Sequence, residues 1–296
     1  MKDHPFLWFL SFFGIFFLVL CAIVVFFIFS VVGEKPEILK TDTIGILKVE
    51  GLIYEVEPLL KVIQKYQKQS SIKAVVVRIE SPGGAVGPSQ ELYQALKELG
   101  KTKKVVASLG AVAASGGYYT ACGAHKIIAN PGTLTGSIGV IMEFAHLQDL
   151  FQWAKISHTV IKSGRYKDVG SPFRPMKEDE RKLLEELIGN VYQQFKGVVL
   201  AERKIRPDQV EMVTDGRIFT GAQAKELGLV DDLGSFEFAV EVAKQLADLK
   251  GDIPLLWPSK EHKYLEFILG ETGSSWFGQT LKKQMISTPL FYLMPI

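Results

Sequence analysis

The hydrophobic and polar positions divide the chain into an apolar amino terminus, an alternating middle and an irregular end. The apolar run from Phe6 to Val32 carries no charge and is interrupted only by small residues. A helix of that length, rising about 1.5 Å per residue, crosses a hydrocarbon core of about 30 Å. A cleavable signal peptide has a shorter apolar region of about 7–15 residues. We therefore predict a retained transmembrane anchor at 6–32, between a stub at 1–5 and a linker at 33–41.

Beyond this linker, strand-like and helical segments alternate along the chain. Such alternation is typical of an α/β domain with a largely parallel sheet, which we place at 42–250. We expect strands at 43–49, 72–79, 104–109, 125–129, 138–142 and 159–161, and helices at 56–69, 90–99, 115–123, 145–154 and 178–202. In the tail at 251–296, proline and glycine break the periodicity, and the apolar end is suited to a neighbour, a membrane or a cleft.

Composition agrees with one large domain and an accessory segment. The chain has 296 residues, of which 47% are hydrophobic and 22% charged. A net charge of +2 gives no reason to expect a nucleic-acid partner. The two cysteines are Cys21, inside the apolar amino terminus, and Cys122, so a framework of intrachain disulfides is not expected.

The segment from Ala113 to Tyr119 carries the first candidate chemistry. It places Ser115 between small residues, just after the apolar run from Val105 to Leu109. Glycines here allow backbone and substrate to approach, and a helix that begins at the serine aims free N–H groups at a developing oxyanion. Ser115 is therefore a candidate nucleophile. The alternative is a helix of small residues that packs on a sheet.

A second glycine turn lies about thirty residues upstream. The buried strand expected at 72–79 runs into Ser-Pro-Gly-Gly at 81–84, and a helical pattern follows. Two such turns can supply the two donors of one oxyanion hole, the N–H groups of Gly84 and Gly116. Two ordinary turns are the alternative. The segment lacks the Gly-Lys-Ser/Thr ending of a phosphate loop, which argues against nucleotide binding.

A serine nucleophile needs a base, and the histidines do not supply an obvious one. They lie before the anchor, at strand starts, in an expected helix and in the tail, at positions 4, 125, 146, 158 and 262. A lysine can replace histidine only if it is buried against apolar surface without a carboxylate partner. Lysines are abundant in this chain, so the residues alone do not select one.

Several ordered motifs together resemble the signal peptide peptidase A family of membrane-bound serine proteases. The resemblance runs from about Thr43 to about Lys250. Its motifs are Ser-Pro-Gly-Gly at 81–84, Ala-Ser-Gly-Gly-Tyr-Tyr at 114–119, Leu-Thr-Gly-Ser-Ile-Gly-Val at 134–140, Ile-Lys-Ser-Gly-Arg-Tyr-Lys-Asp at 161–168, and the segments 215–221 and 224–231. Ordered motifs with compatible spacings are much harder to obtain by chance than one glycine turn.

The resemblance implies a Ser–Lys dyad enzyme on a Clp/crotonase-like α/β fold, with no metal or organic cofactor. By resemblance the base is Lys167, and Lys162 is the fallback. Asp168 is the objection, because a carboxylate beside the amine would keep it protonated. Adjacent residues of an extended segment point to opposite sides, so Asp168 need not contact the amine. Ser137 is a candidate for orienting the amine, or else a strand-edge serine bonded to its own backbone.

The resemblance also implies the setting of the enzyme. The charges that flank the anchor are too balanced to decide its orientation. The orientation therefore comes from the resemblance, which places the amino end in the cytoplasm and the catalytic domain on the outer side of the plasma membrane. Substrates would be signal peptides and other apolar peptides at the bilayer. Protomers would form a homo-oligomeric ring, and the resemblance leaves open whether Ser115 and Lys167 meet within one chain or across an interface. A crotonase-like acyl-CoA enzyme and a non-catalytic membrane scaffold are the other classes of function.

Overall fold

The computed structural model describes residues 14–23, 41–258 and 291–293, and the chain forms two compact units, 1–41 and 42–296. In the first unit, residues 14–23 form an exposed helix. This helix lies inside the predicted anchor at 6–32, the rest of which falls outside the described residues. Within the described ranges, no helix has both the length and the apolar character needed to cross a membrane.

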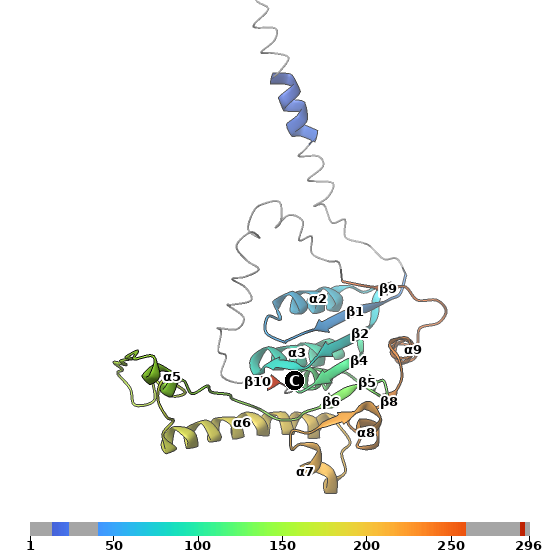
Figure 1. Cartoon of the computed structure of the whole chain (residues 1–296). Coiled ribbons are helices and arrows are strands. Elements are labelled where there is room, and N and C mark those ends of the chain that lie inside the picture. Colours follow the sequence, from blue (N-terminus) through green and yellow to red (C-terminus); the bar gives the residue numbers. More distant parts are fainter. Residues whose placement is uncertain (1–13, 24–40, 259–290, 294–296) are drawn as a thin grey trace, which may run out of the picture. The chain divides into compact units, whose positions relative to one another are not determined.

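The second unit is built on an eight-stranded sheet (Figure 1). Its main path has the order β7-β6-β4-β2-β1-β9, and β5 continues from β4 to β8. All neighbouring strands are parallel except β6 and β7. The strands are β1 Thr43–Glu50, β2 Ile72–Ser81, β4 Lys104–Ala114, β5 Lys126–Ala129, β6 Leu134–Gly136, β7 Ile218–Thr220, β8 Asp232–Leu233 and β9 Leu255–Leu256. The mainly parallel α/β architecture predicted from the alternation is confirmed, and the sheet extends past residue 250.

Helices cover both faces of this sheet. Along β1, Leu47 and Val49 belong to one hydrophobic core, and Ile44 and Ile46 belong to the other, as the two-residue period of a strand requires. The first core lies under α2, α3, α4 and α6, and the second lies under α9. The helices are α2 Glu57–Lys68, α3 Val86–Gly100, α4 Gly116–Ala121, α5 Gln148–Trp153, α6 Glu178–Glu202, α7 Val210–Val213 after a 3-10 turn at Pro207–Gln209, α8 Gly221–Glu226 and α9 Phe236–Leu246.

Two predicted strands are wrong, those at 138–142 and 159–161. The chain leaves the sheet before the first of them, because β6 ends at Gly136 and both Gly136 and Ser137 have positive φ angles, of 80° and 51°. The apolar residue Ile138 is nevertheless fully buried. Residues 159–161 are exposed and have no partner strand in the described part of the chain, so their backbone does not form a ladder.

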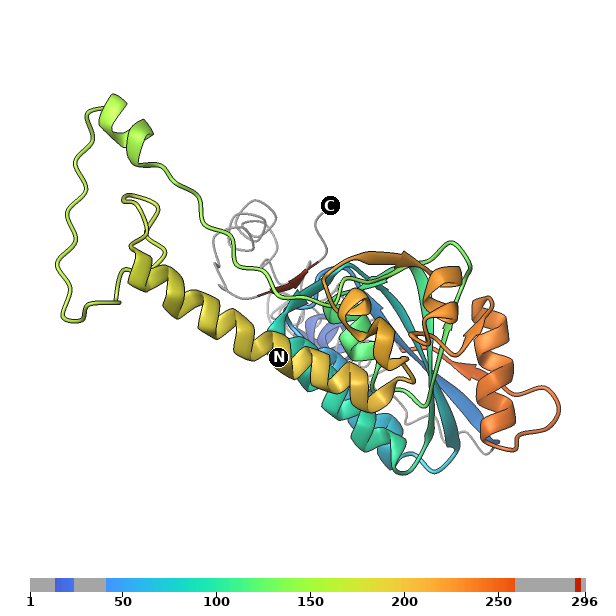
Figure 2. The same cartoon turned by 90° about the horizontal axis from the view of Figure 1, so that it is seen from below.

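Residues 142–177, which we call the arm, connect the sheet to α6. Figures 1 and 2 show the arm extending away from the sheet, with α5 near its far end. Large apolar side chains on it face solvent: Trp153 is 82% exposed and Ile161 is 97% exposed. The helix predicted at 145–154 is shorter in the structure, where α5 has no buried residue.

Candidate active site

Ser115 stands where β4 ends and α4 begins. Its backbone has φ 51° and ψ −117°, a conformation that costs a non-glycine residue about 1–3 kcal/mol. The residue is fully buried, and its Oγ has no hydrogen-bond partner in the described part of the chain. A strained backbone with an unpaired buried hydroxyl is a combination that folding alone does not favour, so it marks a candidate functional site.

The two glycine turns predicted from the sequence meet beside Ser115. Ser81, at the end of β2, is paired with Ala113 of β4. A Cβ atom added to Gly117 would lie only 2.8 Å from the carbonyl oxygen of Ser81. The start of α4 therefore packs against the turn that leads into β3 (Gly83–Ala85), and only glycine at position 117 permits this approach.

Gly84 presents its N–H to the edge of β3 that faces away from Ile53. The neighbours of Gly84 turn to the other side, since the carbonyl of Gly83 accepts from Ile53 N at 3.0 Å and Ala85 N donates to Ile53 O at 2.8 Å. Polar groups of successive residues in a strand alternate in direction, so the Gly84 N–H points away from Ile53. Gly116 is the first residue of α4, and its N–H has no acceptor inside the helix. These are the two predicted oxyanion donors.

A strand from the carboxyl end of the chain, β10 (Phe291–Leu293), lies along this edge. It pairs antiparallel with β3, and Tyr292 is opposite Gly84. An extended peptide segment thus fits beside the glycine turn next to Ser115. Sequence reasoning left the place of the tail open, because an apolar end without a turn carries no signal for a particular partner.

Ser137 also lies next to Ser115. Gly136 pairs with Ala114, and Ser115 N donates to the carbonyl oxygen of Gly136 at 2.8 Å. Ser115 and Ser137 therefore follow the ends of two neighbouring strands, and both have a φ of 51°. Ser137 is 5% exposed, and its own N–H donates to Arg217 O at 2.8 Å.

The two candidate lysines lie on the arm, in one segment of bends and turns. Lys167 is exposed and makes no salt bridge within the described residues, and its backbone N–H donates to Gly164 O at 3.2 Å. Lys162 pairs with the carboxylate of Asp168 and donates to Arg165 O at 2.9 Å. The single chain brings together Ser115, Gly84, Gly116 and Ser137. It does not bring Lys167 to Ser115, because no described residue forms a hydrogen bond with Ser115 Oγ.

Comparison with known proteins identifies the family of this chain. Residues 97–250, just over half of the chain, match peptidase family S49. The chain is 48% identical over 188 residues to a putative protease of Synechocystis sp., and the aligned region covers 64% of this chain and 68% of that protein. It is 36% identical over 243 residues to the chloroplastic serine protease SPPA of Arabidopsis thaliana, with 80% and 36% covered. It is 33% identical over 229 residues to a putative signal peptide peptidase SppA of Enterococcus faecium, with 76% and 66% covered.

This chain belongs to peptidase family S49. The resemblance to the signal peptide peptidase A family drawn from the motifs is thereby confirmed, and the chain is a serine peptidase. The match includes both Ser115 and Lys167. The alternatives of an acyl-CoA enzyme and a non-catalytic scaffold are not supported by these relatives.

Among the residues that the structure describes in this S49 peptidase, no histidine lies beside Ser115 as a base. His125 Nδ1 accepts the backbone N–H of Val105 at 3.0 Å, and burial lowers the pKa of this histidine. Val105 lies ten residues before Ser115 on an extended strand, a distance of about 30 Å. His146 and His158 lie on the arm, whereas positions 4 and 262 fall outside the described residues.

The described part of this peptidase contains neither a reactive buried thiol nor a cluster of metal ligands. Cys122 is buried just after α4, and burial raises the pKa of its thiol to about 12. Among the described residues, no cluster of three or more His, Cys, Asp and Glu side chains could hold a metal ion.

The last motif of the resemblance, at 224–231, connects the elements that hold Ser115 in place. Asp231 accepts from the backbone N–H of Ile127 at 2.8 Å and pairs with Arg203 at 2.9 Å and with Lys126 at 3.1 Å. The carbonyl of Leu229 accepts from the hydroxyl of the fully buried Tyr118 at 2.7 Å. These bonds fix α4, and with it Ser115, to the carboxyl end of α6 and to β5.

Proposed function

We propose that this S49 peptidase is a membrane-anchored endopeptidase in which Ser115 is the nucleophile and Lys167 the general base. The observation that carries the proposal is the placement of Ser115. Its hydroxyl is buried and unpaired among the described residues, and it lies on a strained turn beside the backbone N–H groups of Gly84 and Gly116. The arm that carries Lys167 supplies a lysine without a counter-ion among the described residues.

The chemistry follows from these groups. Ser115 Oγ attacks the carbonyl carbon of a peptide bond, and the neutral amine of Lys167 takes the hydroxyl proton. The N–H groups of Gly84 and Gly116 stabilise the negative charge on the carbonyl oxygen. The carbon–nitrogen bond then breaks, and the protonated lysine gives its proton to the leaving amine. Water releases the acyl group by the same route, with Lys167 again accepting the proton.

The dyad is completed between protomers of a ring in this proposal. Among the described residues no base contacts Ser115 Oγ, and the arm carries exposed apolar side chains that a second copy would cover, such as Trp153 and Ile161. Large exposed apolar surface of this kind is typical of interaction sites. A neighbouring copy that buried the arm would also remove water from Lys167, as a neutral lysine base requires.

The substrates in this proposal are remnant signal peptides and other apolar peptides at the membrane. The pairing of β10 with β3 supports an extended substrate that adds as a strand beside Gly84. The predicted anchor at 6–32 would hold the catalytic unit at the outer face of the plasma membrane. The parallel sheet with an oxyanion turn after each of two strands supports the Clp/crotonase-like assignment of the fold.

The test uses the full-length chain purified in detergent and a fluorogenic apolar peptide. We expect Ser115→Ala and Lys167→Ala each to remove peptidase activity while the far-UV circular dichroism spectrum stays unchanged. Covalent labelling by a serine-reactive phosphonate should be lost in Ser115→Ala. Activity that persisted in Ser115→Ala would overturn the assignment of the nucleophile, and activity that persisted in Lys167→Ala would overturn that of the base.

Mixing the two inactive variants tests the shared dyad. When Ser115→Ala and Lys167→Ala protomers are co-assembled in equal amounts, about a quarter of the sites receive an intact serine from one protomer and an intact lysine from its neighbour. We expect about a quarter of the wild-type rate to return. A mixture without activity, from rings shown to contain both variants, would place both residues of the dyad in one chain.

A further inference from the structure

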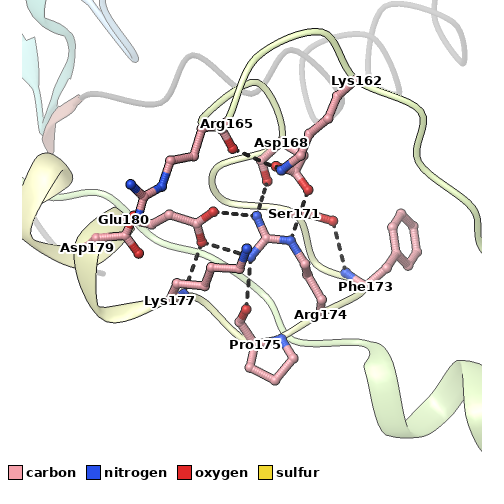
Figure 3. A network of polar contacts seen from close by, with 10 residues as sticks. All are labelled: Lys162, Arg165, Asp168, Ser171, Phe173, Arg174, Pro175, Lys177, Asp179 and Glu180. Atoms are coloured by element: carbon pink, nitrogen blue, oxygen red, sulfur yellow. Dashed lines mark hydrogen bonds and ion pairs between the residues drawn. The ribbon is translucent and has the colours of Figure 1, made fainter.

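The turn that carries Lys167 is held by a network of charged side chains that the chemistry above does not use. Figure 3 shows this network, in which Arg174 lies between the carboxylates of Asp168 and Glu180. Arg174 Nε donates to Asp168 Oδ2 at 3.0 Å, and its two terminal nitrogens donate to the two oxygens of Glu180 at 2.7 and 2.6 Å. The guanidinium also donates to the carbonyls of Asp168 at 3.1 Å and Pro175 at 3.0 Å.

The far side of the network is fixed to the first turn of α6. The side chain of Glu180 is 1% exposed, and its carboxylate also accepts the backbone N–H of Lys177 at 3.0 Å. Hydrogen bonds from Arg174 lower the pKa of Glu180 to about 2, so this anchor keeps its charge at neutral pH. A second tether, Arg165 to Asp179 at 2.6 Å, joins the same turn to α6 without contacting Asp168.

The near side of the network is the carboxylate that directly follows Lys167. One oxygen of Asp168 pairs with Lys162 and the other with Arg174, and this side chain is only 12% exposed. Hydrogen bonds from Arg174 and Lys162 hold the pKa of Asp168 well below its usual range. Both oxygens of the carboxylate are thus engaged by cations other than Lys167.

We propose that Arg174 and Lys162 are positioning residues for Lys167, because together they engage the neighbouring carboxylate of Asp168 and leave the amine of Lys167 without a counter-ion. The inference rests on the proposed role of Lys167 as the base. A lysine that pairs with a carboxylate stays protonated to higher pH and cannot accept the serine proton. By engaging the Asp168 carboxylate, the network prevents this acidic neighbour from keeping the Lys167 amine protonated.

The test compares pH–rate profiles of the full-length chain with substitutions that free the Asp168 carboxylate. Lys162→Met removes the partner of one Asp168 carboxylate oxygen. Arg174→Lys keeps a cation beside Glu180 but removes the guanidinium group that also bonds to Asp168. In both variants we expect the rising limb of kcat/KM to move about one pH unit toward alkaline values, so that the rate on the limb falls about tenfold. The plateau at high pH should be largely kept.

A second substitution separates this role from a merely structural one. Asp168→Asn removes the charge that the network restrains, so adding it to Lys162→Met or to Arg174→Lys should return the limb to its wild-type position. Arg165→Met, the matched control, removes a tether to α6 without freeing Asp168 and should leave the limb in place. A limb that did not move in Lys162→Met and Arg174→Lys, or that Asp168→Asn did not restore, would overturn the inference.

Failure of the inference is distinct from failure of the proposed dyad. If Lys167 is not the base, Lys167→Ala stays active and the proposed function is wrong. If Lys167→Ala is inactive but the pH position of the rising limb does not depend on the charge of Asp168, the proposed dyad stands and only the positioning role is wrong.

Discussion

Ser115 should make the protein less stable than it would be with a residue that cannot catalyse. Two features of its environment are unfavourable: the positive φ of 51°, and the buried Oγ, which has no hydrogen-bond partner among the described residues. Removing the hydroxyl by Ser115→Ala eliminates an unsatisfied buried polar group, for which we expect a gain of about 1 kcal/mol in the free energy of unfolding.

Ser115→Gly should gain more, because glycine also accepts the backbone conformation. Relief of strain contributes about 1–2 kcal/mol, and the greater freedom of glycine in the unfolded chain takes back about 0.5–1 kcal/mol. With about 1 kcal/mol from removal of the hydroxyl, the net expectation is about 1–2.5 kcal/mol above wild type. For a unit of this size each kcal/mol corresponds to about 2–4 °C in melting temperature. Both variants should be inactive.

The matched control is Ser108→Ala, on the strand β4 that leads to Ser115. Ser108 is 1% exposed, as buried as Ser115, but its Oγ accepts a hydrogen bond from Arg78 at 3.0 Å. Removing this satisfied hydroxyl should destabilise the protein by about 1 kcal/mol. Equilibrium denaturation and calorimetry of the full-length chain measure all three variants. The reasoning is refuted if Ser115→Ala loses stability as Ser108→Ala does, since the hydroxyl would then be satisfied in solution.

Three further outcomes follow from the site. Lys167→Arg should be as inactive as an alanine variant, because a guanidinium stays protonated, whereas His125→Ala should keep most of the peptidase rate; the opposite pair of results would favour a histidine base. Gly84→Ala should lower kcat/KM by about a hundredfold or more, because the new Cβ would lie 2.2 Å from Ile53 O and displace the proposed oxyanion donor. Gly87→Ala, where nothing lies within 4 Å of the new Cβ, should stay active. Deletion of 290–296 should lower KM for an apolar peptide severalfold without changing kcat, because β10 competes for the edge of β3, and an unchanged KM would contradict that competition.

The sequence predicted best the elements that carry a long or regular pattern. The helix predicted at 178–202 is α6 with the same bounds, since twenty-five residues of amphipathic periodicity leave little ambiguity. The strand predicted at 138–142 failed because a short apolar run does not reveal that the positive φ angles of Gly136 and Ser137 turn the chain out of the sheet. Strand β3 has only three residues and two glycines, too few for any periodic signal.

The site was predictable to the extent that its residues lie in one turn or at neighbouring strand ends. Motifs pointed to Ser115, Gly84 and Gly116, and the parallel sheet places them together because successive strands end at the same edge. Arg174 has the pattern of a structural ion-pair residue, but its pairing with Asp168 was not predicted. A pairing six residues apart in a loop without regular structure has no sequence period by which it can be recognised.

The separation of Ser115 from Lys167 has a consequence for when the peptidase acts. If the neighbouring protomer provides the base, an isolated protomer carries a nucleophile with oxyanion donors but no group to activate it, and its rate should fall on dilution below the assembly concentration. The same contact that covers the exposed Trp153 and Ile161 would then build the catalytic site. The free energy of burying the apolar arm would thereby be coupled to activity, so that proteolysis is confined to the assembled ring.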